Sequence, residues 1–222
     1  MASLAHQMHA AVFDLDGTLL DSLGVWDDAD RAFLSRRGIP LTPDYTESVK
    51  LMHLEEAARY TKARYSLSEH PEEIMNEWLA SIRAAYAEMP LKPYAKEYLL
   101  MLHASGVKLA IATSSDEQIF LPALEHNGIR DLFSAAVMVR EVERGKEFPD
   151  VYLEAARRLG IAPQESAVFE DILPAVKAAK TGGFFTAAVY DEGSRGDEEA
   201  LRREADCYVT SYEELLLSPI LF

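Results

Sequence analysis

The sequence predicts an α/β fold, a Rossmann-like parallel sheet covered by helices on both faces, with an inserted α-helical cap domain. Two observations lead to this prediction. From Pro93 onward, short apolar segments alternate with helical segments, which is typical of a parallel sheet covered on both faces. Before Pro90, a long helical section shows no strand signal. We therefore expect a core domain of residues 1–21 and 91–222 and a cap domain of residues 22–90.

The strands are predicted from short apolar runs bounded by turn residues. The first run, Ala10–Phe13, is too short and too apolar for a surface helix. The other strands are expected at Val107–Ala112, Ala135–Met138, Ala167–Phe169 and Phe184–Val189. The helices of this section are expected to end at His103 and to span Gln118–His126, Asp150–Leu159 and Pro174–Lys180.

The helices of the cap are predicted from their stop signals. They are expected at Val25–Arg37, at Pro43–Tyr65 with a break near His53, and at Pro71–Glu88. Because this section is inserted after the first strand, we expect it above the carboxyl end of that strand, where a lid would lie.

Composition limits the classes of function. A chain of 222 residues that is 49% hydrophobic can bury a core, and its net charge of −15 argues against nucleic acid as a partner. The single cysteine, Cys207, lies near a late strand and cannot form an internal disulfide, which favours a reducing compartment. No secretory leader and no apolar run of about 18 residues is evident. We expect a cytoplasmic monomer that has no nucleic-acid or membrane partner.

The segment Val12–Thr18, VFDLDGT, places Asp14 and Asp16 directly after the first predicted strand. Two buried carboxylates repel each other, so their pairing makes sense if Mg²⁺ holds them, one as nucleophile and the other as proton carrier. Gly17 permits a tight turn and offers an N–H to an anion. The alternatives are ordinary turn chemistry and a calcium loop. A calcium loop of the EF-hand type would need another acid at Thr18 and a glutamate near Val25, and the sequence has neither.

Polar residues also follow the other predicted strands, where ligands bind in such a sheet. Thr113, Ser114 and Ser115 follow the second strand and could hold phosphate oxygens or only cap a helix. Lys146, after the third strand, could neutralise a phosphoryl group or simply face solvent. Glu170 and Asp171 follow the fourth strand, where two acids are costly unless a cation binds them or they cap a helix.

Together, VFDLDGT, the threonine after the second strand, the lysine of K-x-x-P-D and the acidic pair of FED resemble the motifs of the haloacid dehalogenase superfamily. The resemblance is to its phosphatase and phosphomutase branch with a helical cap, and it covers nearly the whole chain. It implies a phosphoric monoester hydrolase that acts on a small phosphorylated metabolite, in which Asp14 attacks phosphorus and Asp16 is the general acid and base. The implied Mg²⁺ ligands are Asp14, Asp16, Glu170 and Asp171, and the expected phosphate-binding residues are Gly17, Thr113, Ser114 and Lys146.

The sequence departs from the family pattern at two positions, each directly after a motif residue. Glu147 stands where relatives usually have proline, and Ile172 stands where many have serine. Neither change removes a residue that the chemistry needs. The carboxylate of Asp16 disfavours carbon–halogen and carbon–phosphorus cleavage, because members with those activities lack an acid at this position.

Two other functions remain open. A sugar phosphomutase similar to β-phosphoglucomutase has a histidine in the first cap helix and an arginine in the second, and Trp26 and about Leu54 occupy those places here. His53, one residue away, keeps this alternative open. A catalytically silent interaction protein would have lost Asp14 or Lys146, and both are present. No motif in the cap identifies the substrate.

Overall fold

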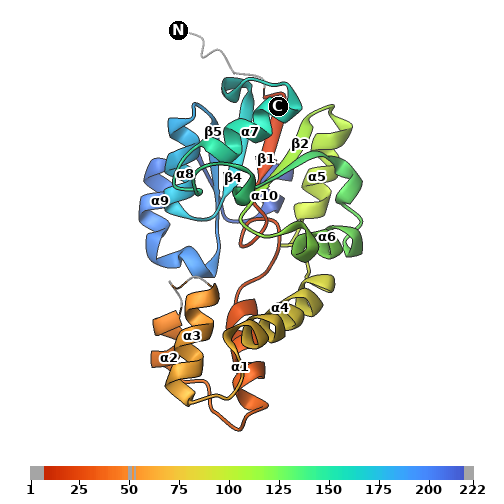
Figure 1. The fold of residues 1–222 in the computed structure, drawn as a ribbon. Coiled ribbons are helices and arrows are strands. Elements are labelled where there is room, and N and C mark those ends of the chain that lie inside the picture. Colours follow the sequence, from red (N-terminus) through yellow and green to blue (C-terminus); the bar gives the residue numbers. More distant parts are fainter. Residues whose placement is uncertain (1–7, 50–51, 53, 218–222) are drawn as a thin grey trace. The chain divides into compact units, whose positions relative to one another are not determined.

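The computed structural model describes residues 8–49, 52 and 54–217. They divide into two compact units (Figure 1). The sheet unit comprises Met1–Leu23 and Met89–Phe222, and the helical unit comprises Gly24–Glu88. None of the helices formed by the described residues combines the length and apolar character needed to cross a bilayer.

Six parallel strands form the sheet in the order β3-β2-β1-β4-β5-β6, which confirms the predicted fold class. The strands are β1 (Ala10–Phe13), β2 (Lys108–Thr113), β3 (Phe133–Met138), β4 (Ser166–Glu170), β5 (Phe185–Val189) and β6 (Cys207–Val209). In the centre, Phe13 pairs with Ile111 of β2 and with Phe169 of β4. The residues that follow these three therefore come to the same edge of the sheet.

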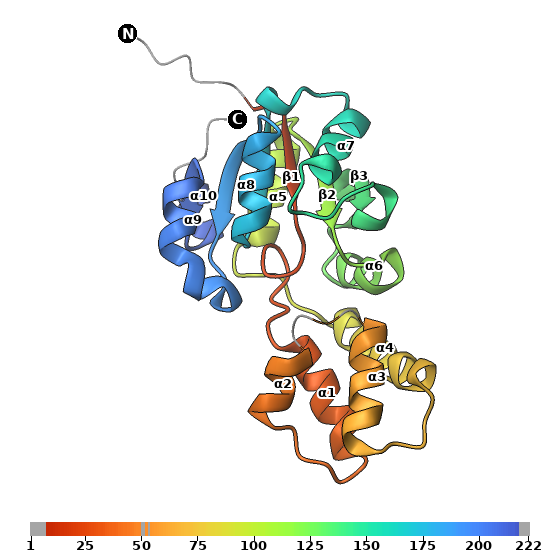
Figure 2. The same ribbon diagram turned by 60° about the vertical axis from the view of Figure 1, so that its left-hand side comes forward.

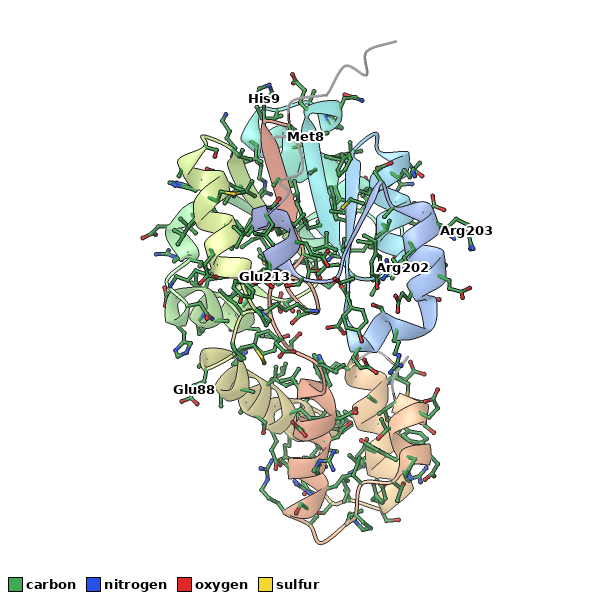
Figure 3. All side chains as sticks on the ribbon, turned by 180° about the vertical axis from the view of Figure 1, so that it is seen from behind. Met8, His9, Glu88, Arg202, Arg203 and Glu213 are labelled. Atoms are coloured by element: carbon green, nitrogen blue, oxygen red, sulfur yellow. The ribbon has the colours of Figure 1, made fainter. Side chains whose placement is uncertain are left out.

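Helices cover both faces of the sheet. Helices α7 (Asp150–Leu159) and α8 (Leu173–Thr181) pack on the face toward the viewer in Figure 1. The opposite face, seen in Figure 3, carries α5 (Ala95–Ala104) and α10 (Tyr212–Leu217). Helices α6 (Glu117–His126) and α9 (Glu198–Glu204) complete the unit, with short 3-10 turns between some of the elements.

The two faces are packed differently because successive residues of a strand point to opposite sides. Ala10 and Val12 of β1 belong to the core under α7 and α8, where small residues let helix and sheet approach closely. On the other side, Phe13 and Phe169 stack with ring centroids 4.4 Å apart. Tyr98 of α5 lies 5.8 Å from the Phe169 ring, so aromatic packing fixes α5 on that face.

The helical unit consists of α1 (Val25–Ser35), α2 (Pro43–Val49), α3 (Leu54–Tyr65) and α4 (Pro71–Ala87) (Figure 2). Helices α1 and α3 both pack on α4. Between α1 and α4, the rings of Phe33 and Trp78 lie 5.5 Å apart. The predicted break within Pro43–Tyr65 separates α2 from α3, whereas His53 itself lies outside the described residues.

Candidate active site

Three buried charged side chains meet at the carboxyl ends of β1 and β4. Asp14 directly follows β1, and its backbone N–H donates to the Phe169 carbonyl at 3.0 Å, which continues the sheet pairing past the strand. Glu170 is the last residue of β4. Lys146 comes from the segment between β3 and α7, and its Nζ donates to Asp14 and, at 2.6 Å, to Glu170 Oε1. The sheet thus brings together residues that are far apart in the sequence.

Burial makes the charges of these groups interdependent. Burial alone raises the pKa of Asp14, the charge of Lys146 opposes this rise, and the net pKa lies well above the usual range. For Lys146, burial lowers the pKa, but the carboxylates of Asp14 and Glu170 more than offset it and the pKa is raised. The lysine is therefore held as an ammonium ion, which is the form that can neutralise a carboxylate or a phosphoryl oxygen.

Asp171 adds a further carboxylate from the residue after β4. Thr18 Oγ1 donates to Asp171 Oδ1 at 3.2 Å, and both residues are buried. Burial, with the nearby charge of Glu170, raises the pKa of Asp171 to about 7, while Lys146 opposes the shift.

Gly17 is required by geometry at this point. Its φ is +77°, and a Cβ there would lie 2.5 Å from Asp171 Oδ2. Its backbone N–H, predicted from the sequence to face an anion, donates to the Leu20 carbonyl at 3.2 Å. The glycine therefore allows the loop after β1 to approach Asp171 closely.

These carboxylates fit a divalent cation. Asp14, Glu170 and Asp171 each offer an oxygen, and the three oxygens lie within 4.8 Å of one another. Glu170 Oε2 is buried and has no hydrogen-bond partner among the described residues. Burying a carboxylate oxygen without a partner costs free energy, and the single charge of Lys146 cannot neutralise three carboxylates. The three oxygens therefore suit a hard divalent cation, which prefers oxygen ligands. The carboxylate of Asp16, the fourth predicted ligand, is not part of this group.

Asp16 instead reaches the end of β2. Ser115 Oγ donates to Asp16 Oδ2 at 2.8 Å, and the Ser115 backbone N–H donates to Thr113 Oγ1 at 3.0 Å. Thr113 is fully buried, whereas Ser114 is exposed. The hydroxyl of Thr113 therefore helps to fold the loop that presents Ser115 to Asp16.

Ser115 belongs to the run of hydroxyl residues after the second strand that was expected to hold phosphate oxygens or to cap a helix, and the structure places its hydroxyl on Asp16. One residue of the site was not predicted. It is Tyr152, whose buried hydroxyl donates to Glu170 Oε1 at 2.7 Å. Tyr152 lies on the inner face of α7, and its pattern in the sequence is that of an ordinary core residue.

The helical unit contains a cavity of about 420 Å³. Trp26 and Leu54, which occupy the places expected for the histidine and arginine of a mutase, both line it. Among the described residues of its wall there is no histidine, lysine or arginine. His53, on which the mutase alternative depended, lies outside the described residues.

Comparison with known proteins identifies the family. The model of the family "Haloacid dehalogenase-like hydrolase" matches residues 11–189, which include every candidate site residue. The chain belongs to this family. The resemblance inferred from the sequence motifs is therefore confirmed.

Relatives of this haloacid dehalogenase-like hydrolase include proteins named for phosphatase activity. It is 33% identical over 186 residues to a probable pseudouridine-5'-phosphatase of Drosophila melanogaster, covering 81% of this chain and 80% of that protein. It is also 33% identical over 190 residues, 84% of this chain, to a bifunctional riboflavin kinase/FMN phosphatase of Arabidopsis thaliana. The chain matches only half the length of that plant protein.

The fold is also found among solved structures. The crystal structure of a putative beta-phosphoglucomutase from Thermotoga maritima is similar with a TM-score of 0.81 at 25% identity. The similarity covers 95% of this chain and 98% of that chain.

Proposed function

We propose that this protein is a Mg²⁺-dependent phosphatase that hydrolyses a phosphate monoester of a small metabolite through an aspartyl-phosphate on Asp14. The observation that carries the proposal is the buried contact of Asp14 with Lys146 beside Glu170 and Asp171. The phosphatase names of two relatives support the same class of reaction.

Asp14 is suited to act as the nucleophile. Its carboxylate lies at the edge of the sheet, and the Lys146 ammonium favours its ionised form against the effect of burial. In the first step a carboxylate oxygen of Asp14 attacks phosphorus in line, the bond to the alcohol oxygen breaks, and that oxygen takes a proton from Asp16. In the second step water gives a proton to Asp16 and attacks phosphorus, which releases phosphate and restores Asp14.

Lys146 and the acidic residues control charge during both steps. The lysine donor lies beside the nucleophile, where it can also offset negative charge on a phosphoryl oxygen. Asp14, Glu170 and Asp171 would hold Mg²⁺, with Asp16 as a further predicted ligand. When bound, the ion supplies positive charge that lets a phosphoryl group approach a cluster of carboxylates.

Phosphate hydrolysis is favoured over phosphoryl transfer between sugar hydroxyls. A mutase must hold a second phosphate, and this requires a cationic or strongly donating group in the cap. Trp26 and Leu54 stand at the expected positions and contribute mainly apolar surface. The described part of that wall therefore offers no positive charge for a second phosphate.

The experiment that tests the proposal compares Asp14→Asn and Asp16→Asn. We expect Asp14→Asn to abolish turnover with the fold intact, because an amide is not a nucleophile. Asp16→Asn should slow alkyl phosphates more than 4-nitrophenyl phosphate, whose leaving group departs without a proton. Asp131→Asn, at an exposed site, is the control. Full activity of pure Asp14→Asn, or equal losses on both substrates for Asp16→Asn, would refute the assigned roles.

A further inference from the structure

The loop that follows β1 begins with Asp14 and also contacts Asp171 at the neighbouring strand end. One oxygen of the Asp171 carboxylate, Oδ2, packs so closely on Gly17 that a Cβ there would lie 2.5 Å from it. The other oxygen, Oδ1, accepts the 3.2 Å hydrogen bond from Thr18 Oγ1. The position of Thr18 therefore helps to set the direction in which Asp171 points.

Backbone hydrogen bonds hold the two ends of this loop. The Asp14 N–H donates to the Phe169 carbonyl at 3.0 Å, and the Lys92 N–H donates to the Leu19 carbonyl at 2.8 Å. Lys92 is itself anchored to the end of β5, because its Nζ donates to the Tyr190 carbonyl at 2.6 Å. The orientation of the residues between these two points then depends on the groups that contact them.

Tyr212 contacts this loop from a distant part of the sequence. It is the first residue of α10, which packs on α5 on the face of the sheet seen in Figure 3. Its hydroxyl donates to the Thr18 carbonyl at 3.2 Å, which joins residues 194 positions apart. Tyr212 is only 1% exposed, so bulk water does not compete for this hydrogen bond.

The Tyr212 hydroxyl lies close to the candidate metal site and stays protonated. Burial raises its pKa well above the usual range, and the nearby Tyr98, Asp14 and Asp171 raise it further. The hydroxyl is therefore a hydrogen-bond donor at neutral pH. Its removal would take this donor from the buried Thr18 carbonyl, and a buried carbonyl that loses its donor costs free energy.

We propose that Tyr212 is a positioning residue for the metal site and acts through Thr18 on Asp171. Its hydroxyl holds the Thr18 carbonyl, which keeps the Thr18 hydroxyl directed at Asp171 Oδ1. The inference rests on the proposed function in one respect, that Asp171 binds Mg²⁺. It gives α10 a role at the site, although no residue of this helix belongs to the group of possible metal ligands among the described residues.

The test measures Mg²⁺ binding to the intact protein by titration calorimetry, which does not depend on turnover. We expect Tyr212→Phe to raise the Kd for Mg²⁺ about threefold, as for the loss of one neutral hydrogen bond. Tyr98→Phe is the matched control and should keep the wild-type Kd. Tyr98 is fully buried, its ring centroid lies 5.6 Å from that of Tyr212, and its hydroxyl has no partner among the described residues. An unchanged Kd in Tyr212→Phe, or the same rise in both variants, would overturn the inference.

A double-mutant cycle tests whether Tyr212 acts through Thr18. Thr18→Val keeps the shape of the side chain but removes the hydroxyl that contacts Asp171, and we expect it to raise the Kd for Mg²⁺ about fivefold. Adding Tyr212→Phe to Thr18→Val should then leave the Kd unchanged, because the hydroxyl whose direction Tyr212 sets is already absent. A further rise of about threefold in the double variant would show that Tyr212 acts by another route and would overturn the inference.

Kinetics provide a readout that lost stability alone would not produce. Tyr212→Phe should raise the Mg²⁺ concentration that gives half-maximal rate about threefold and leave kcat at saturating Mg²⁺ and the substrate KM unchanged. A lower kcat at saturating Mg²⁺ with an unchanged Mg²⁺ requirement would contradict the positioning of Asp171. If the wild-type protein binds no Mg²⁺, the proposed function fails and the inference fails with it. If it binds Mg²⁺ and Tyr212→Phe binds equally well, only the inference fails.

Discussion

Ser115 Oγ donates a 2.8 Å hydrogen bond to Asp16 Oδ2, which joins the loop after β2 to the loop after β1. Asp16 is the proposed general acid and base, so its carboxylate must point at the leaving oxygen rather than rotate freely. The serine is a positioning residue, since it acts on the reaction through Asp16.

We expect Ser115→Ala to lower kcat for alkyl phosphates about tenfold with little change in KM. The magnitude follows from the loss of one hydrogen bond to a charged group. The loss should be smaller for 4-nitrophenyl phosphate, and Ser115→Thr should restore most of the rate because it keeps the hydroxyl. Ser105→Ala, at an exposed helix end, is the control. A change in KM alone would mean that Ser115 contacts substrate and does not position Asp16.

Tyr152 and Lys146 both donate to Glu170 Oε1, at 2.7 and 2.6 Å, which leaves Oε2 without a partner among the described residues. We expect Tyr152→Phe to weaken Mg²⁺ binding about tenfold, because hydrogen bonds to a ligand orient it toward the metal. Calorimetric titration with Mg²⁺ measures the effect independently of turnover. Tyr98→Phe is the matched control, because the buried Tyr98 hydroxyl has no partner among the described residues. Equal Mg²⁺ affinities of the two variants would contradict the role of Tyr152.

Metal removal should abolish activity. We expect dialysis against EDTA to stop turnover and Mg²⁺ to restore it. Ca²⁺ should inhibit, because it accepts more ligands and a less compact geometry than Mg²⁺ does. Asp171→Ala should raise the Mg²⁺ concentration that gives half-maximal rate, and Glu170→Ala should do so less. Undiminished rates after EDTA would exclude the metal role.

Asp30 should make stability depend on pH. Its pKa is raised from 3.8 to about 6 in the folded protein, so ionisation of this group favours unfolding. The penalty is absent below about pH 4, grows as the pH rises through the folded pKa and is complete above it. After allowance for partial exposure we expect Asp30→Asn to raise the free energy of unfolding by about 1 kcal/mol at pH 7.5 and not at pH 4. Urea unfolding of this variant and of Asp28→Asn at both pH values checks the difference.

Phosphorus NMR separates a phosphatase from a mutase. With β-glucose 1-phosphate we expect slow release of inorganic phosphate, no glucose 6-phosphate and no stimulation by a sugar bisphosphate. The reason is that Trp26 and Leu54 offer no charge for a second phosphate. Accumulation of the 6-phosphate faster than free phosphate would establish the mutase.

The fold class followed from the sequence because each strand of the sheet centre is a short apolar run between turn residues. Ala10–Phe13 is both the predicted and the observed first strand. β3 begins two residues earlier than predicted, at Phe133. β6 spans only Cys207–Val209. The sequence analysis expected a late strand near Cys207 but could not give its bounds, since three residues carry no periodic signal.

The candidate site could be predicted in part for the same reason. Residues that directly follow strands of a parallel sheet must meet at one edge, so Asp14, Glu170 and Asp171 come together through register alone. Lys146 could be placed only through its motif, because it lies in a loop whose path periodicity does not specify.

Only the tertiary structure determined how these groups are paired. Tyr152 to Glu170, Ser115 to Asp16 and Thr18 to Asp171 are contacts between side chains on different elements. Each depends on helix packing, loop conformation and rotamer choice, which are set by the whole core and leave no local pattern in the sequence. The sequence alone thus determined at which strand ends the candidate catalytic and metal-binding residues lie. Packing decided which side chain forms a hydrogen bond with each of them and so orients it.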